Sequence, residues 1–374
     1  MIQTYDSGSL PFTGDLAKFF SGAKVTSLME ILRPTKYSSD LQYFEDIIKK
    51  SFIDKVRAGI DIPNYLQIRD MNEMFLDSIK EIEKTGEGYV LRGVPSIRQG
   101  RLLIPEVHVL RDKSREISEE LGEALKIKIC VTGPYTLSTL FSQRRRGLLT
   151  LLGNVVAKIV EGNIFTNKFG GVMLVAVDEP VFGFLDDPSL DYGSEGREEL
   201  LEAWEQIFHQ VKSKNLQSCI HLHNTSNELF WQIKSLDIIE SHVNDPLYVS
   251  PRTRRFLEEE DKVLKASIAI TAFDSLIRKT IPTRKKMNEA ILSQQVADTW
   301  TAIRKEKLNP IDFLESVKTI TGRLKKLLKK FGENRIPYAG PECGLRSFPT
   351  YSTALECLRR IALAVKEINL GANS

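Results

Sequence analysis

The sequence contains no apolar run that approaches the roughly 20 residues needed to cross a bilayer. Its first twenty residues carry acidic and polar side chains in place of the apolar core of a signal peptide. Cysteine is scarce: four residues, at positions 130, 219, 343 and 357, are too widely spaced for a small disulfide framework. The formal net charge is only +3, so composition predicts no polyanionic partner. These absences predict a cytoplasmic protein with neither membrane nor nucleic-acid partners, in which every cysteine is a thiol.

The chain has 374 residues, more than the usual size of one hydrophobic core. Length alone leaves one large α/β barrel or two smaller domains open. Short apolar runs alternate with helical patterns from end to end, and neither a repeat nor a low-complexity linker interrupts them. About eight such units favour a closed barrel over an open sheet. We therefore expect residues 1–374 to form a single catalytic domain, a (β/α)8 TIM barrel with insertions.

The alternation predicts the following elements. The β-like runs are 2–5, 60–63, 89–91, 125–132, 172–177, 217–223, 236–240, 263–270 and 335–338, with a hairpin-like excursion at 101–109. The helical patterns are clearest at 39–58, from residue 69 onward, from 137 to 168, and at 195–213.

In a parallel α/β barrel, functional side chains gather where strands end and the following loops begin. The polar and small residues at those ends are Ser7, Gly8, Ser9, Asp178, Glu179, His221, His223, Glu240, Asp274 and Cys343. Glu240 ends an apolar run, where a carboxylate adds little to stability. Cys343 lies in a tight loop whose glycines allow close backbone approach.

Two histidines one residue apart, His221 and His223, end the short strand at 217–223. Positions i and i+2 of a strand point to the same face, so both rings can converge on one point. With Glu240 and Cys343 they would form the mixed nitrogen, oxygen and sulfur site that zinc prefers. The alternative is a polar stripe of histidines, a surface Glu240 and a buried Cys343 that only fills space. The position of all four on successive strand ends favours the metal site.

Seven short motifs follow one another along the chain: Ser7-Gly8-Ser9-Leu10-Pro11, Asp70-Met71, Gly133-Pro134-Tyr135-Thr136, Asp178-Glu179-Pro180, His221-Leu222-His223, Glu240-Ser241 and Pro341-Glu342-Cys343-Gly344-Leu345. This ordered set resembles the catalytic C-terminal barrel of the cobalamin-independent methionine synthases, almost from end to end of the chain. The resemblance is to the short, single-barrel core form of archaea and some bacteria, within the uroporphyrinogen decarboxylase/methionine synthase superfamily. The Asp-Glu-Pro and Cys-Gly-Leu motifs are the more specific ones.

The resemblance implies a zinc site formed by His221, His223, Glu240 and Cys343. His223 stands where the family usually has a cysteine, which removes one thiolate and about one negative charge. Imidazole remains a competent zinc ligand. The metal would then be a stronger Lewis acid, and a thiol bound to it would lose its proton readily.

The resemblance also implies a substrate site. In the family the Ser-Gly-Ser turn holds the carboxylate of homocysteine, which assigns Ser7, Gly8 and Ser9 to the substrate. Asp178, the residue that we expect to be catalytic, would take the ammonium group, and Met71 would line the same pocket. The implied reaction moves a methyl group to the zinc-activated thiol of homocysteine and gives methionine. The alternative for Asp178 is a helix N-cap after a strand.

Three departures from the family concern the amino group and the methyl donor. Asn64-Tyr65 replaces a Gly-Glu pair whose carboxylate helps to bind the amino group. The run 138–141 lacks the tryptophan that stacks on the pterin of methyl-tetrahydrofolate. The proton-donating histidine expected after the seventh strand has no counterpart in residues 263–283. Together these departures favour a methyl-cobamide on a separate corrinoid protein as the donor.

Other interpretations stay open. Tyr135 or Phe141 could still stack on a folate. The arginine run 144–146 is either a solvated helix face or a grip on an anionic cofactor or acidic partner. The acceptor could be another thiol such as coenzyme M, or the chain could be a non-catalytic corrinoid- or metal-binding homologue. A zinc hydrolase is disfavoured, because only Glu179 or His242 could serve as general base beside the metal motif.

Overall fold

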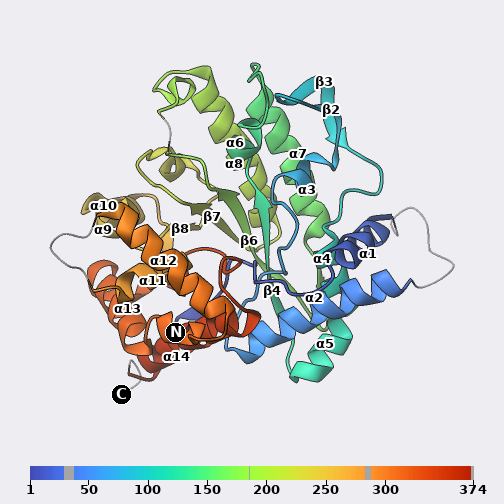
Figure 1. The fold of residues 1–374 in the computed structure, drawn as a ribbon. Helices are drawn as coiled ribbons and strands as arrows, with labels where there is room; N and C mark the ends of the chain where they lie inside the picture. The colour runs from blue at the N-terminus through green and yellow to red at the C-terminus, as the bar shows by residue number, and fades with distance from the viewer. Residues whose placement is uncertain (29–37, 185, 283–287, 372–374) are drawn as a thin grey trace.

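The main sheet of the protein is parallel and curved, with helices around it (Figure 1). The computed structural model describes residues 1–28, 38–184, 186–282 and 288–371. Seven parallel strands stand in the order β1-β10-β9-β8-β7-β6-β4. They are β1 (Gln3–Thr4), β4 (Leu125–Thr132), β6 (Gly170–Glu179), β7 (Gln217–Leu222), β8 (Ile238–Glu240), β9 (Val263–Ala269) and β10 (Tyr338–Pro341). The predicted α/β class is confirmed.

Residues 62–64 lie between the two edge strands of this sheet, β1 and β4. Ile62 forms a single parallel bridge to Tyr5, and Asn64 forms one to Lys128. Ile62 N donates to Thr4 O at 3.0 Å, and Lys128 N donates to Pro63 O at 2.9 Å. The run predicted at 60–63 therefore contacts both edge strands through single bridges. It forms no regular ladder of hydrogen bonds, because Pro63 has no N–H to donate.

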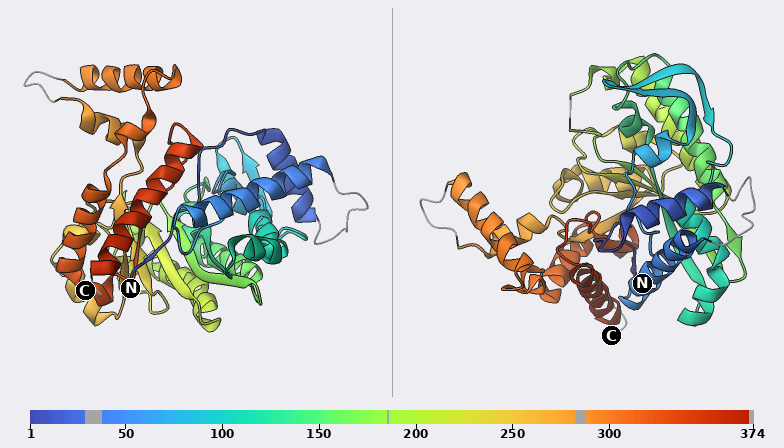
Figure 2. Two further views of the ribbon diagram at one scale, coloured as in Figure 1. Left: turned by 90° about the horizontal axis from the view of Figure 1, so that it is seen from below. Right: turned by 45° about the vertical axis from the view of Figure 1, so that its right-hand side comes forward.

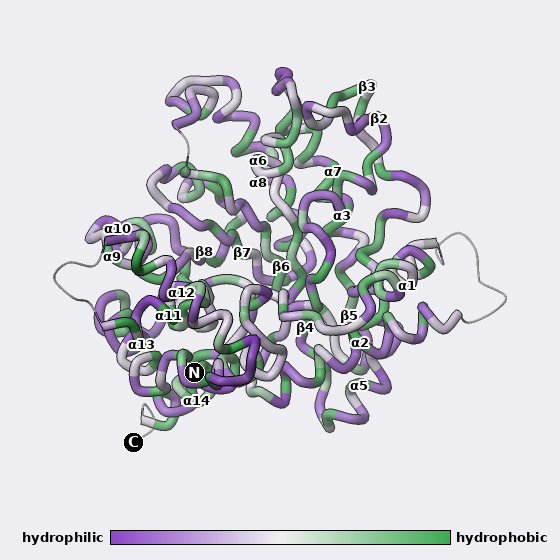
Figure 3. Tube along the Cα trace, viewed as in Figure 1, coloured by the Kyte–Doolittle hydropathy of each residue, from purple (hydrophilic) through white to green (hydrophobic). Residues whose placement is uncertain are grey.

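The helices are α1 (Leu16–Leu28), α2 (Ser39–Arg57), α3 (Glu73–Leu76), α4 (Pro105–Asp112), α5 (Ser114–Leu121), α6 (Pro134–Ser138), α7 (Leu148–Asn163), α8 (Glu195–Ser213), α9 (Pro246–Val249), α10 (Arg252–Glu259), α11 (Phe273–Thr280), α12 (Glu289–Arg304), α13 (Val317–Phe331) and α14 (Tyr351–Gly371). Hydrophobic and hydrophilic residues alternate along them, as expected for helices with one face on the core (Figure 3). Within the described ranges, no helix combines the length and apolar character needed to cross a membrane.

Two additions depart from simple strand–helix alternation. An antiparallel hairpin of β2 (Ile79–Thr85) and β3 (Gly88–Ile97) precedes α4, and β5 (Thr166–Asn167) pairs antiparallel with β6. After β9, helices α11 and α12 form an excursion, and α12 stands apart from the sheet in Figure 2. Only Val296 and Ile303 of α12 are buried among its described residues.

Local chemistry explains where the sequence predictions hold and where they are wrong. Ser38 and Ser194 each accept a backbone N–H as N-caps, and α2 and α8 begin directly after them, as predicted. The hairpin-like excursion predicted at 101–109 is wrong, because Pro105 opens α4 at the first helical position. The long helix expected up to residue 168 is two helices, α6 and α7, and Gly147 between them has a left-handed φ of 78°.

Candidate metal centre

The carboxyl ends of β7 and β8 place four polar side chains at two levels. His221 on β7 is paired with Glu240 on β8 in the parallel register. His223 and His242 each follow two residues later, and positions i and i+2 of an extended chain face the same way. His221 and Glu240 therefore form an inner level, and His223 and His242 form an outer level nearer the loops.

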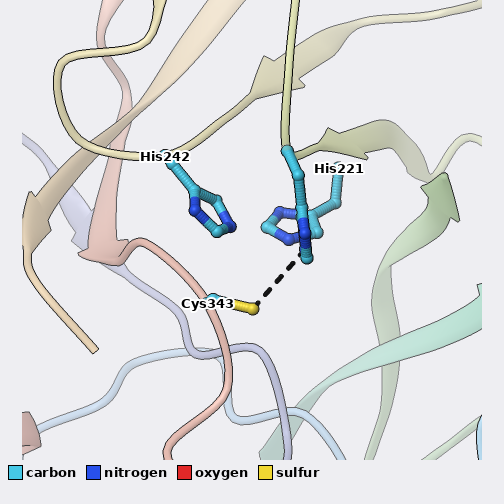
Figure 4. Close-up of side chains that lie close together, drawn as sticks. His221, His242 and Cys343 are labelled. Atoms are coloured by element: carbon cyan, nitrogen blue, oxygen red, sulfur yellow. Dashed lines mark hydrogen bonds between the residues drawn. The ribbon is translucent and has the colours of Figure 1, made fainter. Parts of the chain in front are cut away.

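Four side chains converge: His221 from the inner level, His223 and His242 from the outer level, and Cys343 from the loop after β10. Ligand atoms of His221, His223, His242 and Cys343 all lie within 4.8 Å of one another. Cys343 Sγ is 3.7 Å from His223 Nε2, and the ring centroids of His223 and His242 are 4.2 Å apart. Figure 4 shows the His221, His242 and Cys343 side chains turned toward a common centre. His221 is buried and the other three are half-buried, so the cluster faces the loop side.

Buried imidazole nitrogens in this cluster lack partners. Nε2 of His221 and Nε2 of His242 make no hydrogen bond within the described part of the chain, whereas Nδ1 of His221 lies 3.3 Å from Glu240 Oε1. A buried polar group without a partner costs about 1–3 kcal/mol, so these atoms favour a further bound group. Three imidazoles and a thiolate match the ligands of tetrahedral zinc sites. The residues present therefore fit a zinc ion.

The charges within the cluster stabilise one another. Burial raises the pKa of the Cys343 thiol, but His221, His223 and His242 lower that pKa further, to well below its usual value. Burial lowers the pKa of His221, but Cys343 and Glu240 raise it to about 10. The three imidazoles therefore favour the thiolate form of Cys343, which is the form that binds metals.

Glu240 lies behind His221 and outside the four-residue cluster. Its Oε2 is 2.8 Å from Lys265 Nζ, and its Oε1 is 3.4 Å from Lys128 Nζ and 3.3 Å from His221 Nδ1. The carboxylate is fully buried. Burial raises the pKa of Glu240, but Lys128 and Lys265 hold it well below its usual value. Glu240 is thus an anion bound to two lysines.

His242 occupies the fourth place in the cluster, where the sequence predicted Glu240. The other three predicted ligands, His221, His223 and Cys343, do come together. The sequence did contain a signal for His242, because it follows Glu240 at the same i+2 spacing that marked His221 and His223.

The predicted substrate turn at 7–9 contacts the loop that holds Cys343. Leu345 N donates to Ser9 O at 3.0 Å. A Cβ at Gly344 would lie 2.0 Å from Ser9 Oγ, so a larger residue there would push the Ser9 side chain away. The turn and the histidine–cysteine cluster therefore share one edge of the sheet.

A buried ion pair fixes the turn at 7–9. Lys55 Nζ is 2.8 Å from Asp6 Oδ2, and it donates to the carbonyl oxygens of Gly8 and Asn64, both at 2.9 Å. Asp6 in turn accepts from Gly8 N at 2.9 Å and from Asn64 N at 2.7 Å. Gly8 has a φ of 109°, a conformation that favours glycine. Asn64, at the place of the glycine in the family's Gly-Glu pair, is part of this scaffold. Tyr65, at the place of the glutamate, is buried, and its hydroxyl donates to Cys130 O at 2.8 Å.

Asp178 and Met71 lie near the same edge. Asp178 is paired with His221 on β7 and with Thr132 on β4. Thr132 Oγ1 donates to Met71 O at 2.6 Å, which holds the Met71 backbone beside this strand end. Asp178 is half-buried, and burial raises its pKa against the opposing effect of His221.

Glu179 has the helix-capping role that was the alternative for Asp178. Its carboxylate accepts from Tyr135 N at 3.0 Å, Thr136 N at 2.6 Å and Trp204 Nε1 at 2.9 Å. These bonds satisfy the N-terminus of α6. Asp178 is thus left out of the cap.

The aromatic and basic residues after β4 are occupied by protein contacts. Tyr135 is buried and its hydroxyl donates to Asp187 at 3.0 Å, while Phe141 is buried beside Tyr89. Arg144 pairs with Asp187 at 2.5 Å.

Comparison with known proteins gives a structural likeness alone. No family model and no curated protein matches the chain by sequence. The structure is similar to a B12-independent methionine synthase from Shewanella sp. W3-18-1 in complex with selenomethionine, with a TM-score of 0.59, 14% identity and 99% of each chain covered. It is also similar to a candidate vitamin-B12-independent methionine synthase from Listeria monocytogenes, with a TM-score of 0.57, 13% identity, and 98% of this chain and 99% of that chain covered. The chain therefore has the fold of the B12-independent methionine synthases, which confirms, at the level of the fold, the resemblance seen in its motifs.

Proposed function

We propose that this chain is a zinc-dependent S-methyltransferase that moves a methyl group to homocysteine and gives methionine. The proposal rests on the convergence of His221, His223, His242 and Cys343, with unpartnered buried nitrogens, beside the turn at 7–9. The fold supports it, because solved structures with this fold are named methionine synthases.

His221, His223, His242 and Cys343 would hold the zinc ion. When bound, zinc would lower the pKa of a substrate thiol so that the thiol reacts as a thiolate near neutral pH. Of these four residues only Cys343 supplies a negative charge, and the charge of Glu240 is already paired with lysines. A ligand set of low charge leaves the centre more electrophilic, which suits the activation of a thiol.

The residues beside the cluster would bind the amino acid. Asp178 would accept the ammonium group, and the turn of Ser7, Gly8 and Ser9 would bind the carboxylate. Ser7 Oγ is buried and makes no hydrogen bond to any described residue, so it can serve a ligand. Met71 would line the pocket. The Shewanella protein was solved with selenomethionine, the selenium analogue of the proposed product.

The proposed donor is a methyl-cobamide carried by a corrinoid protein. In the transfer an S–CH3 bond forms and the donor–CH3 bond breaks, and the donor keeps the bonding electron pair. Cobalt accepts that pair without a proton, whereas a pterin nitrogen needs one. Tyr135 and Phe141 are both buried, and residues 263–283 contain no histidine, which favours a donor that needs neither stacking nor protonation.

We also propose that residues 1–374 act as one catalytic (β/α)8 barrel, in which the segment 62–64 serves as the second strand. Its single bridges to Tyr5 and Lys128 support this closure.

The test is to incubate the zinc-loaded protein and homocysteine with methylcobalamin or with methyl-tetrahydrofolate and to measure methionine by mass spectrometry. We expect methionine from methylcobalamin. Methionine from the folate alone would overturn the donor assignment. Preferred methylation of coenzyme M, which has no ammonium group, would overturn the acceptor assignment. A zinc-bound protein that transfers no methyl group in any combination would overturn the enzymatic proposal and favour a binding homologue.

A further inference from the structure

Glu240 lies deeper in the sheet than the cluster. In the strand register it is level with His221, whereas His223 and His242 follow two residues later. Among the described residues, the group of converging ligand atoms contains His242 and leaves Glu240 out. Viewed from the loops, the carboxylate is therefore behind the His221 ring.

Three basic side chains from three strands surround the Glu240 carboxylate. Lys265 on β9 lies at 2.8 Å, His221 on β7 at 3.3 Å and Lys128 on β4 at 3.4 Å. All four residues are buried. Both carboxylate oxygens are thus within ion-pair distance of an ammonium group. A metal that took Glu240 as a ligand would compete with two buried ammonium groups that have lost their contact with water.

The two lysines are themselves held in place. Lys128 Nζ lies 4.2 Å from the centroid of the Tyr5 ring, and Lys265 Nζ lies 5.4 Å from it. Lys265 Nζ also donates a hydrogen bond to Pro341 O, two residues before Cys343. Lys265 therefore connects the inner carboxylate to the strand end that presents the thiolate.

The contact with Glu240 determines which nitrogen of His221 faces the cluster. Nδ1 is on the side of Glu240 Oε1 at 3.3 Å, which is short enough for a hydrogen bond once the ring is aligned. A proton on Nδ1 leaves the lone pair on Nε2, which is buried and without a partner among the described residues. A carboxylate behind a ligating histidine fixes the tautomer and makes the ligand more basic.

We propose that Glu240 is a positioning residue, held by Lys128 and Lys265 against His221, and that His242 completes the ligand set in its place. This inference rests on the metal centre proposed above. Glu240 would orient the Nε2 atom of His221 toward the metal, and its own oxygens would stay on the lysines.

The test compares Glu240→Gln, His242→Ala and the control Glu179→Gln by zinc affinity and by the absorption spectrum of the cobalt(II)-loaded protein. Glu179 is a matched control, because it is a buried carboxylate at the end of β6, two strands away from β8, and it binds α6 and Trp204. We expect Glu240→Gln to weaken zinc binding by roughly ten- to a hundredfold with unchanged ligand-field bands. His242→Ala should change those bands, and Glu179→Gln should change neither readout.

Two results would overturn this inference and leave the metal centre in place. One is altered ligand-field bands in Glu240→Gln together with normal bands in His242→Ala. The other is unchanged zinc affinity in Glu240→Gln.

Because Glu240→Gln leaves two buried lysines without an anion and can fail to fold, a measurement on the wild-type protein complements it. In the zinc-loaded, 15N-histidine-labelled protein, which has five histidines, we expect His221 to be protonated at Nδ1 and metal-bound at Nε2. Binding through Nδ1 would contradict the inference. A wild-type protein that binds no metal would instead overturn the metal centre itself, and this inference with it.

Discussion

Cys343 Sγ lies 3.7 Å from His223 Nε2, although 120 positions separate the two residues in the chain. The contact joins the loop after β10 to the end of β7 and makes Cys343 the only thiol of the candidate centre among the described residues. Both residues are half-buried, so a ligand from the loop side can approach them.

Replacing Cys343 with serine should remove the thiolate and lower zinc affinity by more than roughly a hundredfold, beyond the range typical of residues that only support a ligand. Competition with a chromophoric chelator measures this change. Cys357→Ala is the control, since Cys357 is buried in α14 and does not belong to the cluster. Unchanged affinity in Cys343→Ser would contradict the assignment of the thiolate.

Replacing Asp178 with asparagine should raise the KM for homocysteine by about ten- to a hundredfold, because an ammonium group would lose its charged acceptor. Zinc content should stay the same. A thiol of similar length without an amino group is the control substrate. Its KM should hardly change, because it has no ammonium group for Asp178 to bind. Equal losses for both thiols would show that Asp178 does not recognise the ammonium group.

Replacing Lys55 with methionine should destabilise the protein by about 3–5 kcal/mol, because it leaves the buried Asp6 carboxylate without its counter-charge. Urea unfolding measures the change. Lys50→Met is the surface control, since the Lys50 side chain is 66% exposed and its pair with Asp54 contributes at most about 1 kcal/mol. Similar effects of the two substitutions would argue against Asp6–Lys55 as the support of the turn at 7–9.

Glu179 should make stability depend on pH. Burial raises its pKa from 4.5 to about 7, although Thr136 and Trp204 oppose the shift. Between these values the folded protein binds more protons than the unfolded chain, so the free energy of unfolding should fall by about 3 kcal/mol as the pH rises through this window. The free energy of unfolding, measured with urea from pH 4.5 to 7, should depend less on pH in Glu179→Gln than in the wild-type protein. Parallel curves for the two proteins would contradict the raised pKa.

The sequence predicted the core of the sheet well, because buried parallel strands appear as continuous apolar runs. The run predicted at 125–132 is β4 itself, and the run at 172–177 is the middle of β6. Hydrophobic periodicity could not predict that the run at 60–63, which ends in Pro63, would form single bridges in place of a regular strand. Nor could it predict the α11–α12 excursion, since its helices have the same pattern as those that cover the sheet.

For the candidate site, the sequence identified the strand ends but not the depth of each side chain. Glu240 is the last residue of β8 and His242 follows two residues later, and only the register with β7 separates the inner position from the outer one. In the sequence alone, nothing distinguishes Lys128 and Lys265 from other charged residues within strands. Their burial against Glu240 depends on the curvature of the whole sheet, which no local pattern encodes.

X-ray absorption at the zinc edge of the wild-type protein tests the metal centre most directly. We expect one zinc per chain, with one sulfur at about 2.3 Å and three nitrogens at about 2.0–2.1 Å. A protein that retains no zinc, or a zinc site without sulfur, would contradict it.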